Sequence, residues 1–187
     1  KAGIYDQFNE TFKQVLVPFL DPAVYGRSIV ENSSFIASSA NPDKRLHGQG
    51  FVARLSGATA EFIQLWRLLF FGENPFIVNT KGRLFLNFKP SIPAWMFTEE
   101  AQEIQYKTPQ GKGMVEMLPE NAVFVHFLGT IPVIIHNPTR KDSWQLSVAR
   151  MKVYPYRKKP YEIRSDRVPD AEFIRERKVE KIECYLK

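Results

Sequence analysis

The hydrophobic pattern of the chain changes its period at Gly72, and this change limits the folds that are open to it. Before that glycine, the three- and four-residue spacing of one buried helical face is kept by Phe62, Leu65, Trp66 and Leu69. We expect this helix to end near residue 71, since glycine commonly stops a helix. After Gly72, short apolar runs are separated by turn residues, as in strands. The sequence therefore predicts an α+β chain with its helices first and its sheet second.

Two further helices are expected in the first part of the chain. Apolar residues at helical spacing predict a helix over 6–20, and Asp21-Pro22 would end it because the residue before a proline avoids the helical conformation. A second, short helix is expected over 33–39, ahead of Asn41-Pro42. These helices are too few to close a domain alone.

The second part of the chain carries strand-like segments with turn residues between them. We expect strands at 83–88, 122–128, 130–136, 144–153 and 179–186. Short strands at this spacing favour an antiparallel β-sandwich. The charged segment 170–177 fits either a short helix or a loop. The predicted organisation is one domain over 1–75 and a β-rich domain over 76–187.

The basic residues are unevenly distributed. The net charge of the 187 residues is +6, and six basic residues lie between positions 152 and 167 against only two acidic ones. Such a cluster could bind nucleic acid or an anionic surface. Pro155 and Pro160 favour instead the solvated face of a turn-rich hairpin, and no recognised nucleic-acid-binding module accompanies the charge.

Cysteine usage and hydropathy bear on the compartment. Cys184 is the single cysteine, which excludes an internal disulfide and suits a reducing compartment, so we expect a cytoplasmic protein. Its polar neighbours predict a strand position that faces the core. No apolar run approaches the roughly 18 residues of a membrane helix, and no signal-peptide pattern opens the chain. The chain begins with Lys1 rather than Met, and we expect it to be a piece of a longer protein.

The sequence carries no spacing that predicts a metal or nucleotide site. His126 and His136 belong to predicted strands and are expected to be structural rather than metal ligands. A nucleophile elbow, a Walker loop and a dinucleotide-binding fingerprint are all absent from the sequence. We therefore expect no cofactor.

Small and hydroxyl residues stand where the helix that ends near residue 71 should begin, in Leu55-Ser56-Gly57-Ala58-Thr59. A helix N-terminus exposes unpaired backbone N–H groups that can hold an anion. Ser56 and Thr59 could add hydroxyl donors, and Gly57 removes the Cβ that would keep a ligand at a distance. The alternative is that Ser56 only caps a core helix.

Further short motifs precede this one, in Glu31-Asn32-Ser33-Ser34, Asn41-Pro42-Asp43 and His47-Gly48. Together with Leu55-Ser56-Gly57-Ala58-Thr59, they resemble the C-terminal end of the inverting β-glucoside phosphorylases, glycoside hydrolase family 94 and its relatives. The first and third motifs are most similar to the β-1,2- and β-1,3-oligoglucan phosphorylases. The family has an (α/α)6 catalytic toroid followed by a small jelly-roll-like β domain. The resemblance implies that residues 1–75 are the last helices of the toroid and 76–187 the β domain.

The resemblance also implies a phosphate site. In the family a Leu-Thr-Gly-Thr-Ala motif opens the last toroid helices, and its hydroxyl residue and glycine bind inorganic phosphate. By this match Ser56 and Gly57 are phosphate contacts and Thr59 lies nearby. Here Ser replaces Thr and one extra small residue precedes the helix, which leaves a contact from Thr59 open.

The family reaction is phosphorolysis with inversion, which yields α-glucose 1-phosphate. An aspartic acid protonates the glycosidic oxygen while phosphate, a co-substrate rather than a cofactor, attacks the anomeric carbon. In the family that acid lies upstream of the phosphate motif, so no catalytic residue is assigned here. The resemblance implies an incomplete enzyme that contributes one wall of the phosphate site.

Weaker candidates for substrate binding are Arg27, Glu31, Asn32, His47 and Arg54. An arginine fork matches phosphate or sugar hydroxyls, but either arginine could equally be a surface residue or pair with a glutamate. The implied partners are a β-linked glucan or oligosaccharide, inorganic phosphate and the remainder of the toroid, with a homodimer left open and no membrane. Two alternatives stay open: a non-catalytic carbohydrate-binding or scaffolding module, and a basic nucleic-acid-associated domain.

Overall fold

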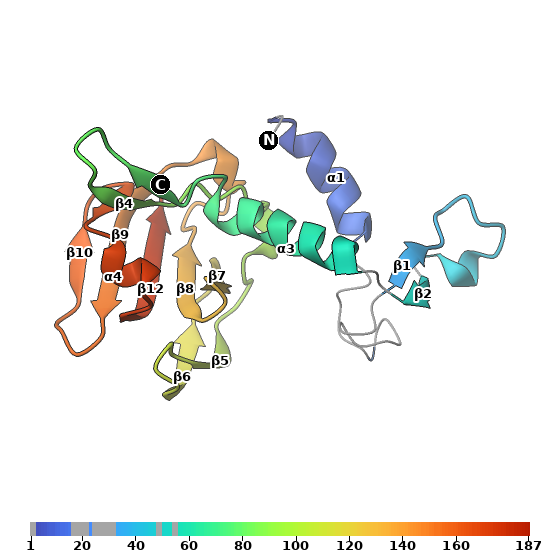
Figure 1. The fold of residues 1–187 in the computed structure, drawn as a ribbon. Helices are drawn as coiled ribbons and strands as arrows, with labels where there is room; N and C mark the ends of the chain where they lie inside the picture. The colour runs from blue at the N-terminus through green and yellow to red at the C-terminus, as the bar shows by residue number, and fades with distance from the viewer. Residues whose placement is uncertain (1–2, 16–22, 24–32, 48–49, 54–55) are drawn as a thin grey trace. The chain divides into compact units, whose positions relative to one another are not determined.

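The computed structural model describes residues 3–15, 23, 33–47, 50–53 and 56–187, and its fold is α+β, as predicted (Figure 1). The chain divides into two compact units, Lys1–Trp66 and Arg67–Lys187. The boundary falls inside helix α3 (Ser56–Phe71). Within the described ranges, no helix is both long and apolar enough to span a membrane.

The first unit combines helices with a small sheet. Its described elements are α1 (Tyr5–Val15), β1 (Ser33–Ile36), the short 3-10 helix η3 (Lys44–Leu46), β2 (Gly50–Ala53) and the beginning of α3. The helix predicted over 6–20 is confirmed as far as Val15, and residues 16–20 lie outside the described part of the chain. Phe12 is buried and meets the Trp66 ring edge-on at 6.3 Å between centroids.

The helix predicted over 33–39 is wrong. Residues 33–36 form β1, which pairs antiparallel with β2 through Phe35 opposite Val52 and Ile36 opposite Gly50. A strand gains its hydrogen bonds from a partner that is distant in sequence, so the local pattern around Asn41-Pro42 could not reveal the pairing. Aromatic and β-branched residues such as Phe35 and Ile36 also favour strands.

Helix α3 ends where the sequence predicted. Gly72 has φ +84°, and its backbone N–H donates to the carbonyl of Leu68 at 3.0 Å. A Cβ at this position would stand 2.9 Å from the carbonyl oxygen of Lys89, so both conformation and space require glycine. The Arg67 guanidinium donates to the carbonyls of Gly72 and Glu73 at 3.2 and 2.7 Å, and thereby pairs carbonyl groups just beyond the helix end.

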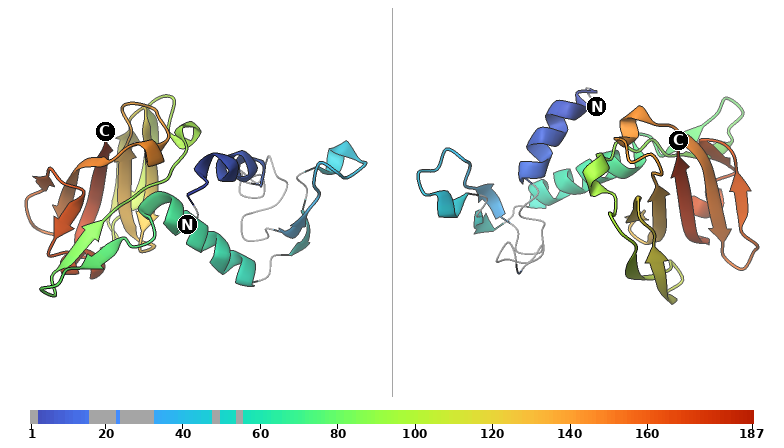
Figure 2. Two further views of the ribbon diagram at one scale, coloured as in Figure 1. Left: turned by 90° about the horizontal axis from the view of Figure 1, so that it is seen from above. Right: turned by 180° about the vertical axis from the view of Figure 1, so that it is seen from behind.

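The second unit is built on a five-stranded sheet with the order β10-β9-β12-β8-β7, which can be followed from two further sides in Figure 2. Its strands are β7 (Ala122–Phe127), β8 (Ile131–His136), β9 (Val148–Pro155), β10 (Tyr161–Ile163) and β12 (Val179–Leu186). The predicted strands at 122–128, 130–136 and 179–186 are confirmed. The strand expected over 144–153 begins later, because a 3-10 turn, η5 (Ser143–Gln145), precedes it.

The expectation of a purely antiparallel sheet is wrong at one pair. Strand β12 runs parallel to β8 and antiparallel to β9. After β8 the chain forms β9, β10, β11 and α4 before it returns, and it then inserts β12 between β8 and β9 (Figure 1). Because these elements lie between β8 and β12 in the sequence, β12 is not joined to its neighbour β8 by a hairpin, and the pair can be parallel.

Two smaller sheets complete the unit. Strands β3 (Phe76–Val78), β4 (Leu84–Asn87) and β11 (Arg167–Pro169) form a three-stranded sheet, so the strand predicted over 83–88 is confirmed as β4. Strands β5 (Gln102–Lys107) and β6 (Gly113–Leu118) form a hairpin. Segment 170–177 contains a single helical turn, α4 (Glu172–Arg175), and another 3-10 turn, η4 (Ala94–Met96), follows β4.

The five-stranded sheet is covered differently on its two faces. On one face, the Phe127 ring of β7 lies 4.7 Å from Phe71, 5.1 Å from Phe88 and 5.5 Å from Phe76, centroid to centroid. These contacts join the sheet to the end of α3 and to the region of β3 and β4. The opposite face is covered in part by the β5–β6 hairpin, where Ile104 and Leu118 pack with Ala122, Phe124 and Ile134.

Candidate functional site

The predicted phosphate residues all fall in one helical turn. Ser56 is the first residue of α3, and Gly57 and Thr59 follow it within the first turn. Backbone N–H groups in the first turn of an α-helix have no partner within the helix, and they carry its partial positive charge. The motif thus stands at the kind of position that suits an anion.

The weaker substrate candidates are only partly described. Arg27, Glu31, Asn32 and Arg54 lie outside the described residues. His47 follows η3, and its Nε2 lies 2.8 Å from the backbone carbonyl of Asn41. This hydrogen bond closes the turn that contains Asp43 and Arg45, whose side chains form an exposed ion pair at 2.8 Å. In this structure His47 therefore holds its own loop together.

Most of the basic cluster at 152–167 lies on or beside a hairpin, as the sequence favoured, whereas Arg167 belongs to β11. Strands β9 and β10 pair antiparallel, and the residues 156–160 that connect them are exposed. Glu162 lies at the centre of the cluster and forms ion pairs with both Arg150 and Arg164. Part of the positive charge is therefore neutralised within the hairpin.

A second candidate site lies on one face of the five-stranded sheet, which we call the polar face. It is formed by alternate residues of three strands, namely Arg150, Lys152 and Tyr154 of β9, Lys181, Glu183 and Tyr185 of β12, and His136 of β8. The opposite face carries fully buried apolar residues such as Met151, Val153 and Ile182. Sequence reasoning missed this site, although the two-residue alternation in both strands was visible.

Two β-bulges set which side chains reach the polar face. The pairing of β9 with β12 skips Ala149 between Val148 and Arg150, and it skips Glu180 between Val179 and Lys181. Each extra residue shifts the alternation by one position. Buried Val148 and Val179 therefore face the core while Arg150 and Lys181, two residues further on, face the polar side.

Lys181 is the centre of an ionic network on this face. Its Nζ lies 2.5 Å from Oε1 of Glu116, on the β5–β6 hairpin, and 2.9 Å from Oε1 of Glu183. Tyr106 donates its hydroxyl to Oε2 of Glu116 at 2.7 Å, and Tyr154 donates to Oε1 of Glu183 at 2.8 Å. The network ties the hairpin to the central strand β12.

Burial and hydrogen bonding have opposite effects on the pKa values of Glu183 and Lys181. Burial raises the pKa of Glu183, but hydrogen bonds from Tyr185, Lys181 and Tyr154 outweigh it and lower the pKa to about 2. Burial lowers the pKa of Lys181, yet the hydrogen bonds to both carboxylates outweigh it and the net pKa is raised. Both groups are therefore charged near neutral pH, and each stabilises the other.

Aromatic stacking extends the network toward β8. The His136 and Tyr185 rings stack at 4.2 Å between centroids, and the Arg150 guanidinium lies 3.5 Å from the Tyr185 centroid. Burial is the main cause that lowers the pKa of His136, so this imidazole is neutral at pH 7. The stack fixes the orientation of Tyr185, whose hydroxyl donates to Glu183 at 2.5 Å.

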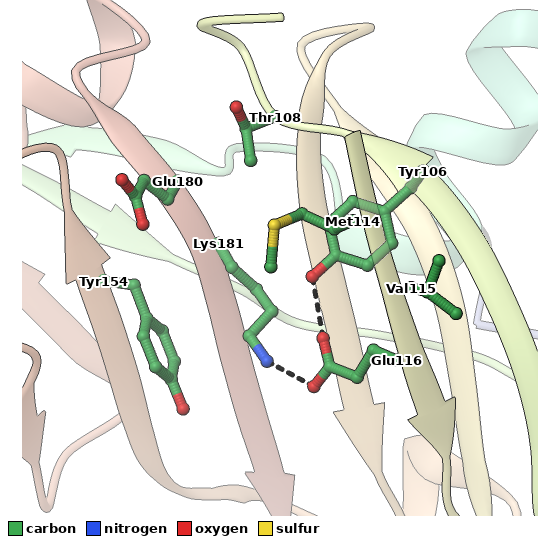
Figure 3. Close-up of a pocket in the computed structure, with 8 residues that line it drawn as sticks. All are labelled: Tyr106, Thr108, Met114, Val115, Glu116, Tyr154, Glu180 and Lys181. Carbon is green, nitrogen blue, oxygen red and sulfur yellow. Dashed lines mark hydrogen bonds and ion pairs between the residues drawn. The ribbon is translucent and has the colours of Figure 1, made fainter. Parts of the chain in front are cut away.

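A cleft of about 320 Å³ opens beside the network, between the β5–β6 hairpin and strands β9 and β12. Its lining consists of Tyr106, Thr108, Met114, Val115, Glu116, Tyr154, Glu180 and Lys181. Figure 3 shows Lys181 between Tyr154 and Glu116, with Glu180 and Thr108 at one end of the cleft. The volume is near the lower end of the roughly 300–1,000 Å³ range of small-molecule sites.

Acid is expected to destabilise the fold by protonating Glu183. The carboxyl of Glu183 has a pKa of about 2 in the fold against an ordinary 4.5, so the unfolded chain takes up the proton first. The free energy of unfolding should therefore fall as the pH drops from about 5 to 2, by roughly 3 kcal/mol from this group. Urea unfolding across this range would show a shallower dependence in Glu183→Gln. The exposed Glu100→Gln control should keep the original slope, and an unchanged slope in Glu183→Gln would contradict the prediction.

Among the described residues, neither the cysteine nor a cluster of metal-ligating groups gives a further site. Cys184 faces the core from β12, as predicted, and burial raises the pKa of its thiol to about 12, so it is not a nucleophile. Within the part of the chain that the structure describes, no group of three or more His, Cys, Asp or Glu residues is placed to hold a metal ion.

The chain was compared with known proteins by sequence. No model of a protein family matches it, and a search of curated proteins found no match.

Proposed function

We propose that this chain is the C-terminal part of an inverting carbohydrate phosphorylase that cleaves β-glucosidic bonds with inorganic phosphate. In this proposal the first unit supplies the last helices of an (α/α)6 toroid, and the second unit is the jelly-roll-like β domain that follows it. Ser56 and Gly57, with Thr59 nearby, contribute one wall of the phosphate site. The catalytic acid and the remainder of the toroid belong to another part of the protein.

The observation that carries the proposal is the position of the motif. Helix α3 begins at Ser56, so the hydroxyl and glycine residues that resemble the phosphate motif occupy its first turn. Phosphate placed there would meet unpaired N–H groups and the positive end of the helix. In phosphorolysis the phosphate is the nucleophile, and its positioning is a large part of catalysis.

Exposed apolar side chains in the first unit support the toroid assignment. Ile4, just before α1, is 60% exposed, and Ile63 in α3 is 64% exposed. Tyr5, Phe8 and Leu65 are also exposed, at 36–39%. Several large apolar side chains left exposed on two helices are what a covering part of a protein would bury. The remaining toroid helices would supply that cover.

The Ser56→Ala variant tests the phosphate assignment in the whole enzyme. A hydrogen bond to a charged ligand is worth roughly 1.5–3 kcal/mol, so kcat/KM for phosphate should fall about 10- to 100-fold. Steady-state kinetics with phosphate as the varied substrate would measure this change.

Ser147→Ala is the matched control, because Ser147 is exposed in the second unit and stands outside the motif. It should leave the kinetic constants unchanged. Thermal unfolding of both variants would separate lost phosphate binding from a lost helix cap, which costs about 1 kcal/mol. Unchanged phosphate kinetics in Ser56→Ala would refute the assignment.

A further inference from the structure

We propose that the cleft on the polar face binds one neutral sugar unit, at a place separate from the phosphate motif. The cleft lies entirely within the second unit and is formed by the β5–β6 hairpin and the strands β9 and β12. That the sugar is a β-linked glucose unit rests on the proposed function. The neutral, hydroxyl-rich character of the ligand follows from the cleft itself.

The charges of the cleft disfavour an anion. The only cationic side chain in its lining is Lys181, and this ammonium is already held by Glu116 and Glu183 at 2.5 and 2.9 Å. Among the described residues, the Glu180 carboxylate has neither a hydrogen-bond partner nor an ion-pair partner. A phosphate or carboxylate ligand would therefore meet negative charge, and the lining itself has no uncommitted cation to balance it.

At the Tyr154 ring a ligand cation is disfavoured as well. The Tyr154 ring, which would be the natural partner of a ligand ammonium, already has two ammonium groups close to it. Nζ of Lys152 lies 4.9 Å and Nζ of Lys181 lies 4.8 Å from the ring centroid. A third cation would be repelled by both of them.

A neutral sugar ring suits the apolar walls of the cleft and its free acceptor. The walls present the side chains of Met114 and Val115 and the Tyr106 ring, against which the C–H groups of a pyranose can pack (Figure 3). Glu180 stands at one end as a free acceptor for ligand hydroxyls, and its position at a β-bulge of β12 directs it there. Such charge-assisted hydrogen bonds are the stronger ones in ligand recognition.

Methionine methyl groups allow binding to be measured at the cleft alone. The chain has four methionines, and Met114 lines the cleft, whereas Met117 is 57% exposed and absent from its lining. The whole protein would be labelled with 13C-methyl methionine and titrated with a β-linked glucotetraose, and separately with inorganic phosphate. A Met114→Leu variant would assign the signal.

We expect the Met114 signal to shift with the oligosaccharide and not with phosphate, while the Met117 signal stays in place. Glu180→Gln should weaken the oligosaccharide affinity read at Met114 by about tenfold, the effect of one charge-assisted hydrogen bond. Glu120→Gln, the same change at an exposed residue outside the cleft, should leave it unchanged.

Three results would overturn the inference: a Met114 signal that the oligosaccharide leaves unmoved, a shift caused by phosphate instead, or an unchanged affinity in Glu180→Gln. These results do not involve turnover. Failure of the cleft proposal is therefore distinguishable from failure of the phosphorylase proposal, which the phosphate kinetics of Ser56→Ala decide.

Discussion

Replacing Lys181 with methionine is expected to lower the free energy of unfolding of the second unit by about 3–5 kcal/mol at pH 7. The variant keeps an unbranched side chain only one atom shorter but removes the charge that lies between Glu116 and Glu183. The side chain of Glu183 is only 10% exposed, so its carboxylate would remain buried without a cation. Removal of one partner from a buried ion pair typically costs this much. Urea unfolding would measure the loss.

Lys152→Met is the matched control for this variant. Lys152 belongs to the same polar face, but among the described residues its charge faces the Tyr154 ring rather than a carboxylate. Its removal should cost less than about 1 kcal/mol. The double variant Lys181→Met with Glu183→Gln should regain part of the loss, because no buried charge then lacks a partner. A Lys181→Met loss no larger than that of Lys152→Met would show that the network is not a stabilising element.

The same network explains the pH range over which the unit should be most stable. The lowered pKa of Glu183 means that its contribution is complete above about pH 5 and is lost toward pH 2. The raised pKa of Lys181 means that its contribution is complete at neutral pH and is lost only at strongly alkaline pH. Lys181→Met should therefore lose less stability, relative to the unmodified protein, in acid than at pH 7.

The sequence was most informative where a local signal and the fold agree. Gly72 was predicted to stop α3 and does so, because its positive φ and its closeness to Lys89 both demand glycine. The apolar runs of β7, β8 and β12 were likewise recognisable, since both flanking turns and continuous apolar residues marked them. Such signals depend on a few neighbouring residues and survive in any tertiary context.

Sequence reasoning failed where pairing between distant segments decides the structure. Residues 33–36 were predicted as a helix but form β1 with β2, and the polar strands β5 and β6 were not predicted at all. In β5 only Ile104 and Tyr106 face inward, which left too few apolar residues for a clear alternation. The cleft was missed for the same reason, because one of its walls is this hairpin.

Phe127→Ala is expected to cost about 3–5 kcal/mol of unfolding free energy, the usual range for a buried phenylalanine. Phe127 is 2% exposed, and its ring contacts three other phenylalanine rings. Truncation would remove these contacts and leave a cavity at the place where β7 meets the end of α3 and the β3–β4 region. Because such a loss can approach the whole stability of a domain, urea unfolding of the milder Phe127→Leu variant should accompany it.

The control for Phe127→Ala is Val78→Ala, since Val78 is a strand residue that is 64% exposed. It should change the unfolding free energy by no more than about 0.5 kcal/mol. A double-mutant cycle of Phe127→Leu with Phe71→Leu should show a coupling of roughly 0.5–1.5 kcal/mol, as contacting aromatic rings do. If the two losses simply add, the rings do not stabilise each other. The junction of α3 with the sheet would then depend on backbone hydrogen bonds, such as those from Lys89 to Phe71 and from Ser91 to Leu69.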